Sequence, residues 1–150
     1  MSRHRSYLPV VRCLLIMKNK VQEMALEFVA LRLAEAAISQ AVESITDLLN
    51  HESGSLSSLR YDVENLRTEL TRIQCFLEDA DHKQEHDRRT QNWINEVRDI
   101  ATEIEDAIQA YIFNIHSSSF LKKPFRLREL RMSVGFIKEK LKSIGESRQR

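Results

Sequence analysis

The stretch EIEDAIQAYIF, residues 103–113, sets an acidic pair beside an apolar stripe. Helical spacing turns Ile104 and Tyr111 towards a protein core. Glu105 and Asp106 must then point largely outward. Two adjacent carboxylates at the edge of a core can accept bidentate hydrogen bonds from an arginine side chain. They can equally be ordinary solvated acids, and the spacing alone leaves both interpretations open.

A second candidate site is the pair His82 and His86, which are four residues apart and flanked by acids. On a helix this spacing places both imidazoles on one face, where they can hold a metal ion. The surrounding segment, residues 79–89, is polar and has no cysteine in register with the pair. The sequence therefore favours a solvated link between two helices, and we expect no metal.

Catalytic chemistry has little support in the chain. No Ser-His-Asp or Cys-His arrangement can be placed, and the phosphate-binding pattern GxxxxGK[ST] does not occur. The paired carboxylates fall on helix positions that we expect to be exposed. We expect no catalytic residue and no enzyme activity.

The charge distribution points to interactions rather than catalysis. The formal net charge is +1, but residues 34–116 hold seven basic and seventeen acidic residues. Residues 1–33 hold six basic and two acidic residues, and residues 117–150 hold ten basic and three acidic ones. An acidic middle and a basic end can contact each other or separate partners.

The basic C-terminal region offers an alternative function, because clustered Lys and Arg can contact the phosphates of a nucleic acid. These residues share a helix with a sharp apolar stripe. Long cationic side chains that rim a hydrophobic core explain the same pattern, so we expect nucleic acid not to be the main partner.

The two cysteines, Cys13 and Cys75, do not form a disulfide framework and fit a reducing compartment. We expect Cys75 to be a buried thiol. No run of 18 apolar residues predicts a membrane span. The basic and apolar N-terminus is interrupted by Arg12, so we interpret it as an extension or an upstream start, with Met24 as an alternative start, rather than a signal peptide.

The rest of the sequence predicts four amphipathic helices. With 42% hydrophobic and 30% charged residues, three Gly and two Pro, the chain favours helices over sheets. Apolar residues recur in steps of three and four, which is clearest as a heptad seam from Leu56 to Ala80. The predicted helices run from near Leu26 to Asn50, from a Ser55 cap through Ala80, from Asp87 or Arg88 to Asn114 or Ile115, and from near Pro124 to a stop at Gly145. Their stripes need one another, which predicts an all-α four-helix bundle with an N-terminal extension.

Two stretches carry a family resemblance, LRTELTRIQCFLEDAD at residues 66–81 and NWINEVRDIATEIEDAIQAYIF at residues 92–113. They resemble the N-terminal coiled-coil domain of plant nucleotide-binding leucine-rich-repeat immune receptors, the Rx N-terminal domain. That family has a leucine seam ending in an FLKDAD-like turn, followed by a WV-x-EVR-x-x-AYD-x-ED-V-ID helix. The resemblance covers about residues 34–150. The matching residues are Phe76, Leu77, Asp79, Ala80, Asp81, Trp93, Val97, Arg98, Ala101, Glu105, Asp106 and Ile108.

The resemblance implies a signalling and protein-interaction domain of plant innate immunity. In the family the acidic motif, here Glu105, Asp106 and Ile108, contacts an arginine cluster in the receptor's own leucine-rich repeats. The implied structural anchors are Trp93, Val97, Arg98, Phe76 and Leu77.

The resemblance also implies partners and a location. The partners are the nucleotide-binding or leucine-rich-repeat regions of an immune receptor, in cis or in trans, and a second copy of the domain. In related receptors the first helix joins a membrane-associated oligomer after activation and triggers cell death, which implies a cytoplasmic protein that associates with the plasma membrane. ADP or ATP belongs to a nucleotide-binding domain absent from these 150 residues, so no cofactor is expected here.

This sequence departs from the family pattern in two places. Gln109 stands where the motif has its last acid, which weakens the expected arginine contact, and Thr102 stands where the family has tyrosine. The family's start aligns near Leu33. Residues 1–33 are therefore an expected extension, partly disordered or continuing into the first helix, that would hinder membrane insertion, and residues 34–150 form the expected Rx-type domain.

Overall fold

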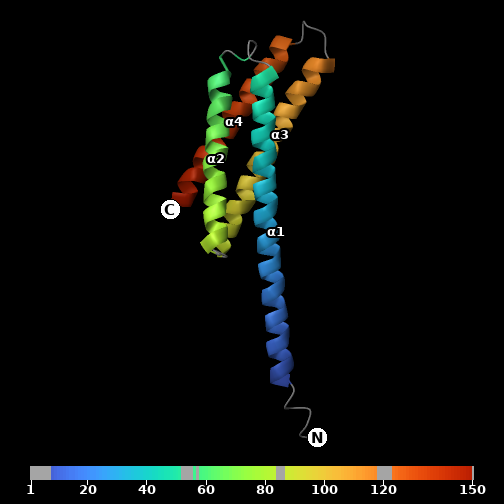
Figure 1. Cartoon of the computed structure of the whole chain (residues 1–150), viewed down its shortest axis with the longest axis vertical. Coiled ribbons are helices and arrows are strands. Elements are labelled where there is room, and N and C mark those ends of the chain that lie inside the picture. The colour runs from blue at the N-terminus through green and yellow to red at the C-terminus, as the bar shows by residue number, and fades with distance from the viewer. Residues whose placement is uncertain (1–7, 52–55, 57, 84–86, 118–122, 150) are drawn as a thin grey trace.

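The part of the chain that the structure describes folds into four long helices, and the predicted all-α four-helix bundle is confirmed (Figure 1). The computed structural model describes residues 8–51, 56, 58–83, 87–117 and 123–149. The helices are α1 (Leu8–His51), α2 (Arg60–Lys83), α3 (Arg88–Ser117) and α4 (Lys123–Gln149).

One hydrophobic core joins all four helices. The most extensive contact is between α1 and α3; α3 also packs along α4, and α2 lies mainly on α1. The apolar steps of three and four place one stripe of each helix inward, because this spacing repeats on one helix face. The largest fully buried side chains are Ile38, Ile45, Leu48, Leu56, Leu59, Val63, Leu66, Leu70, Leu77, Ile94, Ile104 and Ile108.

The first half of α1 projects beyond the bundle as a single helix (Figure 1). None of its described residues before Leu31 is buried. The predicted start near Leu26 is wrong, since the helix begins at Leu8. Pro9 lies in the first turn, where a missing N–H is tolerated, and no glycine follows within the helix. The helix passes the expected boundary after Leu33 without a break, and the division into two domains stays a prediction.

The start of α3 is marked by a capping residue. The Asp87 carboxylate accepts a hydrogen bond from the backbone N–H of Thr90 at 2.7 Å, which satisfies one of the free donors of the first turn. The predicted start at Asp87 or Arg88 is confirmed, although α3 continues to Ser117. The proposed cap Ser55 lies outside the described residues.

The predicted end of the fourth helix at Gly145 is wrong, because α4 continues to Gln149. A Cβ added at Gly145 would meet nothing within 4 Å. The glycine therefore stands on an open helix surface, where its cost is too small to end a helix of this length. Pro124 is the second residue of α4, as its fixed φ favours.

Two predictions about α2 are wrong for one reason. Phe76, an expected anchor, is 45% exposed, and Cys75, an expected buried thiol, is exposed. The buried seam passes through Ile73, Leu77 and Ala80. Cys75 and Phe76 fall between seam positions, so the helical twist of about 100° per residue turns both away from the core.

Replacement of the core residue Ile45 tests how strongly the bundle depends on its packing. Ile45 is 0% exposed, so Ile45→Ala leaves a cavity and lowers the free energy of unfolding by about 2–5 kcal/mol. Urea denaturation followed by circular dichroism measures the change. The control Leu26→Ala, at a site 69% exposed, changes it by less than about 0.5 kcal/mol. Equal losses in both variants would contradict the assignment of the core.

The cap of α3 gives a second prediction. Asp87→Ala removes the acceptor for the Thr90 N–H and lowers the free energy of unfolding by about 1 kcal/mol. Asp87→Asn keeps a capping oxygen and restores most of that loss. If Asn were as destabilising as Ala in the same denaturation experiment, the cap would not be the cause.

Candidate docking surface on α3

The acidic pair lies on the side of α3 that faces away from the core. Ile104 and Ile108 are 1% and 2% exposed and hold the helix against its neighbours. Glu105 is half-buried at the edge of this contact, and Asp106 is exposed. The core packing therefore fixes the direction of both carboxylates.

An acid before the pair and an amide after it are engaged within the bundle. The Glu103 carboxylate accepts two hydrogen bonds from Nζ of Lys140 on α4, both at 2.8 Å. Nε2 of Gln109 donates to Oγ of Ser44 on α1 at 3.3 Å. Position 109, where the resemblance predicts an acid, thus joins α3 to α1 instead.

Glu105 and Asp106 themselves have no hydrogen-bond or ion-pair partner among the residues that the structure describes. The two neighbouring carboxylates are thus open to a cation from outside the bundle. A planar guanidinium suits either carboxylate, because it donates several hydrogen bonds in a fixed fork. The two side chains project about 100° apart around the helix, so each can meet its own cation.

The remaining expected site residues lie apart from the acidic pair. Leu77, Trp93 and Val97 are buried in the core at 0%, 4% and 1% exposure. Arg98 is half-buried, and its guanidinium lies 3.4 Å from the Asp99 carboxylate. The Arg98 carbonyl accepts a hydrogen bond from the Thr102 hydroxyl at 2.9 Å.

A groove between α3 and α4 begins one residue beyond the acidic pair in sequence, and the sequence analysis missed it. Its lining is mainly apolar, with the Arg126–Glu129 ion pair in its wall. Its lining includes Ala107, which directly follows Asp106, together with Met132 and Phe136 of α4. Met132 is 59% exposed and Phe136 is 69% exposed. The sequence did contain a sign of this groove, because Met132 and Phe136 are large apolar residues that fall outside the expected apolar stripe of α4. The groove can receive an apolar side chain beside a cation held by the acids.

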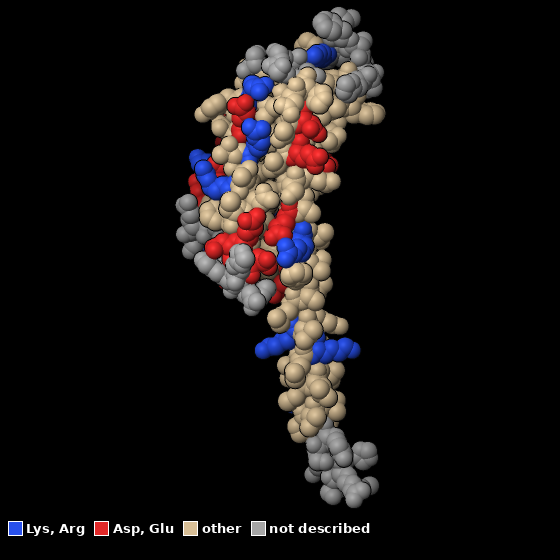
Figure 2. All heavy atoms as spheres, viewed as in Figure 1, with Lys and Arg blue, Asp and Glu red and all other residues tan. Residues whose placement is uncertain are grey.

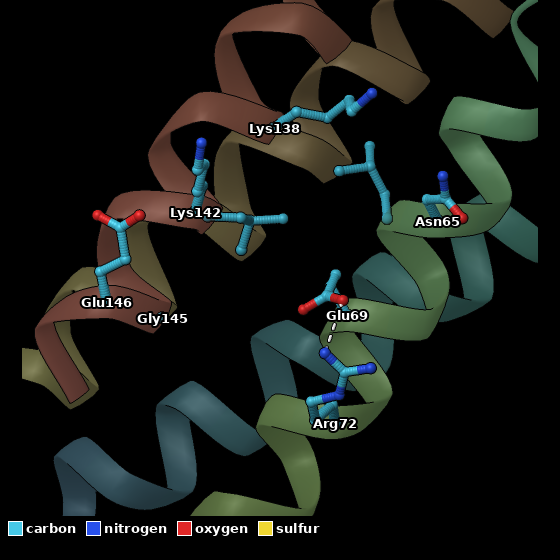
Figure 3. Close-up of a pocket in the computed structure, with 9 residues that line it drawn as sticks. Asn65, Glu69, Arg72, Lys138, Lys142, Gly145 and Glu146 are labelled. Carbon is cyan, nitrogen blue, oxygen red and sulfur yellow. Dashed lines mark hydrogen bonds and ion pairs between the residues drawn. The ribbon is translucent and has the colours of Figure 1, made fainter. Parts of the chain in front are cut away.

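A second groove lies between α2 and α4 (Figure 3). On α2, Glu69 and Arg72 form an ion pair at 2.9 Å. Lys142 and Glu146 of α4 lie across from them. Both signs of charge line this groove, so it favours no ligand of one charge.

The basic side chains of α4 are partly neutralised by the acidic bundle. Lys138 donates to the Asp62 carboxylate of α2 at 2.7 Å, and this hydrogen bond raises the pKa of Lys138. Lys140 contacts Glu103 in the same way. These pairs favour cationic side chains that rim the core over a nucleic-acid surface.

The part of the chain that the structure describes shows neither a metal site nor a membrane-spanning helix. Within it, no three His, Cys, Asp or Glu side chains come together as metal ligands. Of the candidate pair, His86 and the side chain of His82 lie outside the described residues. No described helix has the length and apolar character for a membrane crossing.

Comparison with known proteins identifies the family. The model of the Rx N-terminal domain matches residues 37–131, well over half of the chain. The chain belongs to the Rx N-terminal domain family. It is the kind of domain found at the N-terminus of plant nucleotide-binding leucine-rich-repeat resistance proteins.

Proteins similar to this Rx N-terminal domain include resistance proteins of two plants. The chain is 35% identical over 85 residues to Putative disease resistance protein At1g50180 of Arabidopsis thaliana. The aligned region covers 57% of this chain and 10% of that relative. The chain is 32% identical over 98 residues to Putative disease resistance RPP13-like protein 2 of the same plant, covering 65% and 11%. Disease resistance protein Pik-2 of Oryza sativa subsp. japonica is 29% identical over 89 residues, covering 57% and 9%. The chain thus spans about a tenth of the length of these relatives, and no solved structure matches it.

Proposed function

We propose that this domain is a signalling module of plant defence that docks onto an arginine-bearing surface of an immune receptor through Glu105 and Asp106. The partner surface lies on a nucleotide-binding or leucine-rich-repeat region, in the same chain or in another. The resemblance of the acidic motif supports this class of partner.

One observation carries the proposal. Glu105 and Asp106 have no partner in the described part of the bundle, while the adjacent Glu103 is paired with Lys140. A rigid helix with two unpaired carboxylates is preorganised for a guanidinium, because no internal ion pair must break before binding. The apolar groove at Ala107 and Phe136 adds contact area next to the charges.

The same proposal includes a location. Docking and signalling take place in the cytoplasm, with association to the plasma membrane after activation. The two cysteines, both free, are compatible with a reducing compartment.

The decisive experiment measures binding of the 150-residue chain to a purified leucine-rich-repeat region of a resistance receptor. Glu105→Ala combined with Asp106→Ala removes both charges and weakens binding by at least about 30-fold, since truncating one side of a close charge pair costs roughly 2 kcal/mol or more. Isothermal titration calorimetry gives the dissociation constants.

A matched control separates local docking from general charge. Glu78→Ala combined with Glu96→Ala removes the same two charges from other exposed positions and leaves the affinity within about twofold. Both double variants keep the helical circular dichroism of the parent. Unchanged binding by the Glu105 and Asp106 variant would sink the docking role.

Position 109 allows a test in the opposite direction. Gln109→Asp adds a third carboxylate beside the pair and strengthens binding by about three- to tenfold, because it gives the arginine surface another charge. The variant loses the hydrogen bond to Ser44, so its thermal stability falls slightly. Gln109→Asn has no added charge and leaves the affinity unchanged. Weaker binding by Gln109→Asp than by Gln109→Asn would contradict the proposed electrostatics.

A further inference from the structure

The projecting half of α1 carries an uninterrupted apolar seam. Its members follow one another in alternating steps of four and three residues. They are Val10, Leu14, Met17, Val21, Met24, Phe28 and Leu31. Only Leu31 is buried; the other six side chains are 48–64% exposed. Three heptads without a charged member are the pattern of a coiled-coil helix, not of a solvated one.

The seam continues in phase into the core of the bundle. Leu31, Ile38 and Ile45 follow Met24 in steps of seven, and all three are buried. The same 3.5-residue repeat is thus covered by the bundle in one half of α1 and uncovered in the other. On the face that Figure 2 shows, the projecting half is mostly uncharged, with a band of basic side chains part-way along.

We propose that a second copy of this chain covers the seam, so that two projecting helices form an antiparallel coiled coil. The seam from Val10 to Phe28 lies outside residues 37–131, the part that matches the family model. The inference therefore does not depend on docking through Glu105 and Asp106.

The bundle itself selects the antiparallel direction. Arg32 of α1 forms an ion pair at 3.5 Å with Asp81 in the last turn of α2, which marks the lower end of the bundle. A parallel partner helix would follow the seam past Leu31 into space that the bundle occupies. An antiparallel partner helix ends where the bundle begins.

The exposed seam has the length and symmetry for this pairing. In the centred register Val10 of each copy faces Phe28 of the other, and Leu14 faces Met24. Met17 faces Val21 next to the two-fold axis. Every layer then pairs apolar side chains, and the interface closes on itself as an isologous dimer.

The flanking charges distinguish this dimer from adsorption on a membrane. Lys18 and Lys20 occupy the positions beside the seam, so like charges of the two copies meet near the two-fold axis. Salt screens this repulsion and strengthens the dimer. Binding to an anionic lipid surface has the opposite salt dependence, and Glu23 and Glu27 on the same segment disfavour it.

Analytical ultracentrifugation of the full chain, at low and high salt, tests the proposal. We expect a dimer whose dissociation constant falls as salt rises. Leu14→Asp combined with Val21→Asp places charges in the seam and raises the constant by at least about 100-fold. A wild-type chain that stays monomeric at every salt concentration overturns the proposal, as does a dimer that the seam variant leaves intact.

The matched control also replaces two apolar residues of the projecting helix by Asp, but at positions outside the seam. Leu15→Asp combined with Leu26→Asp replaces two side chains that are 56% and 69% exposed outside the seam, and we expect it to dimerise like the parent. Circular dichroism and urea denaturation of both variants check that the bundle is intact. Equal loss of dimer in both variants overturns the seam assignment.

Two further measurements test the direction of pairing and the competing occupant. A chain with Lys18→Glu and Lys20→Glu, mixed with wild type, forms heterodimers in preference to either homodimer, because opposite charges then meet at the two-fold axis. Random mixing contradicts the antiparallel arrangement. The competing occupant is tested by flotation with vesicles of phosphatidylcholine and phosphatidylserine. If the chain is monomeric, floats with the vesicles at low salt and no longer floats at high salt, the seam is assigned to a lipid surface instead.

Discussion

The packing of α3 against α1 and α4 is the contact on which the rest of the bundle depends. Ile104, Ile108 and Tyr111 are buried on one face of α3, and no other helix makes such extensive contacts with two neighbours. Because both flanks of α3 are held, its outer face has one fixed direction. The position of the acidic pair is therefore a product of apolar packing rather than of its own electrostatic contacts.

Charge then separates the surface into satisfied and available groups. Lys138 and Lys140 of α4 pair with Asp62 and Glu103, so part of the basic end is used to fasten the acidic middle. Exposed pairs of this kind contribute little to stability. Their larger effect is on recognition. The paired carboxylates are neutralised within the bundle, and the unpaired ones stay available to bind a partner.

Periodicity predicted the features that depend on one stripe per helix. The number of helices, the seam of α2 and the burial of Trp93 follow from spacing alone, because a repeat of 3.6 residues decides which face is inward. The same repeat extends back along α1 to Val10, yet the start of the helix was missed. Periodicity shows which face of a helix is apolar, but not whether the segment belongs to the helix that enters the bundle. The contact between Gln109 and Ser44 depends on how two helices approach, which no local pattern contains.

The single helix α1 has a mechanical consequence. It contains 44 residues and is thus about 66 Å long, with one half clamped in the core and the other half outside. A helix without an internal break transmits bending and torsion along its axis. Any load that restrains the outer half becomes a torque on the inner half, where α1 shares its largest contact with α3. The contact with α3 is therefore where the bundle would resist such a torque.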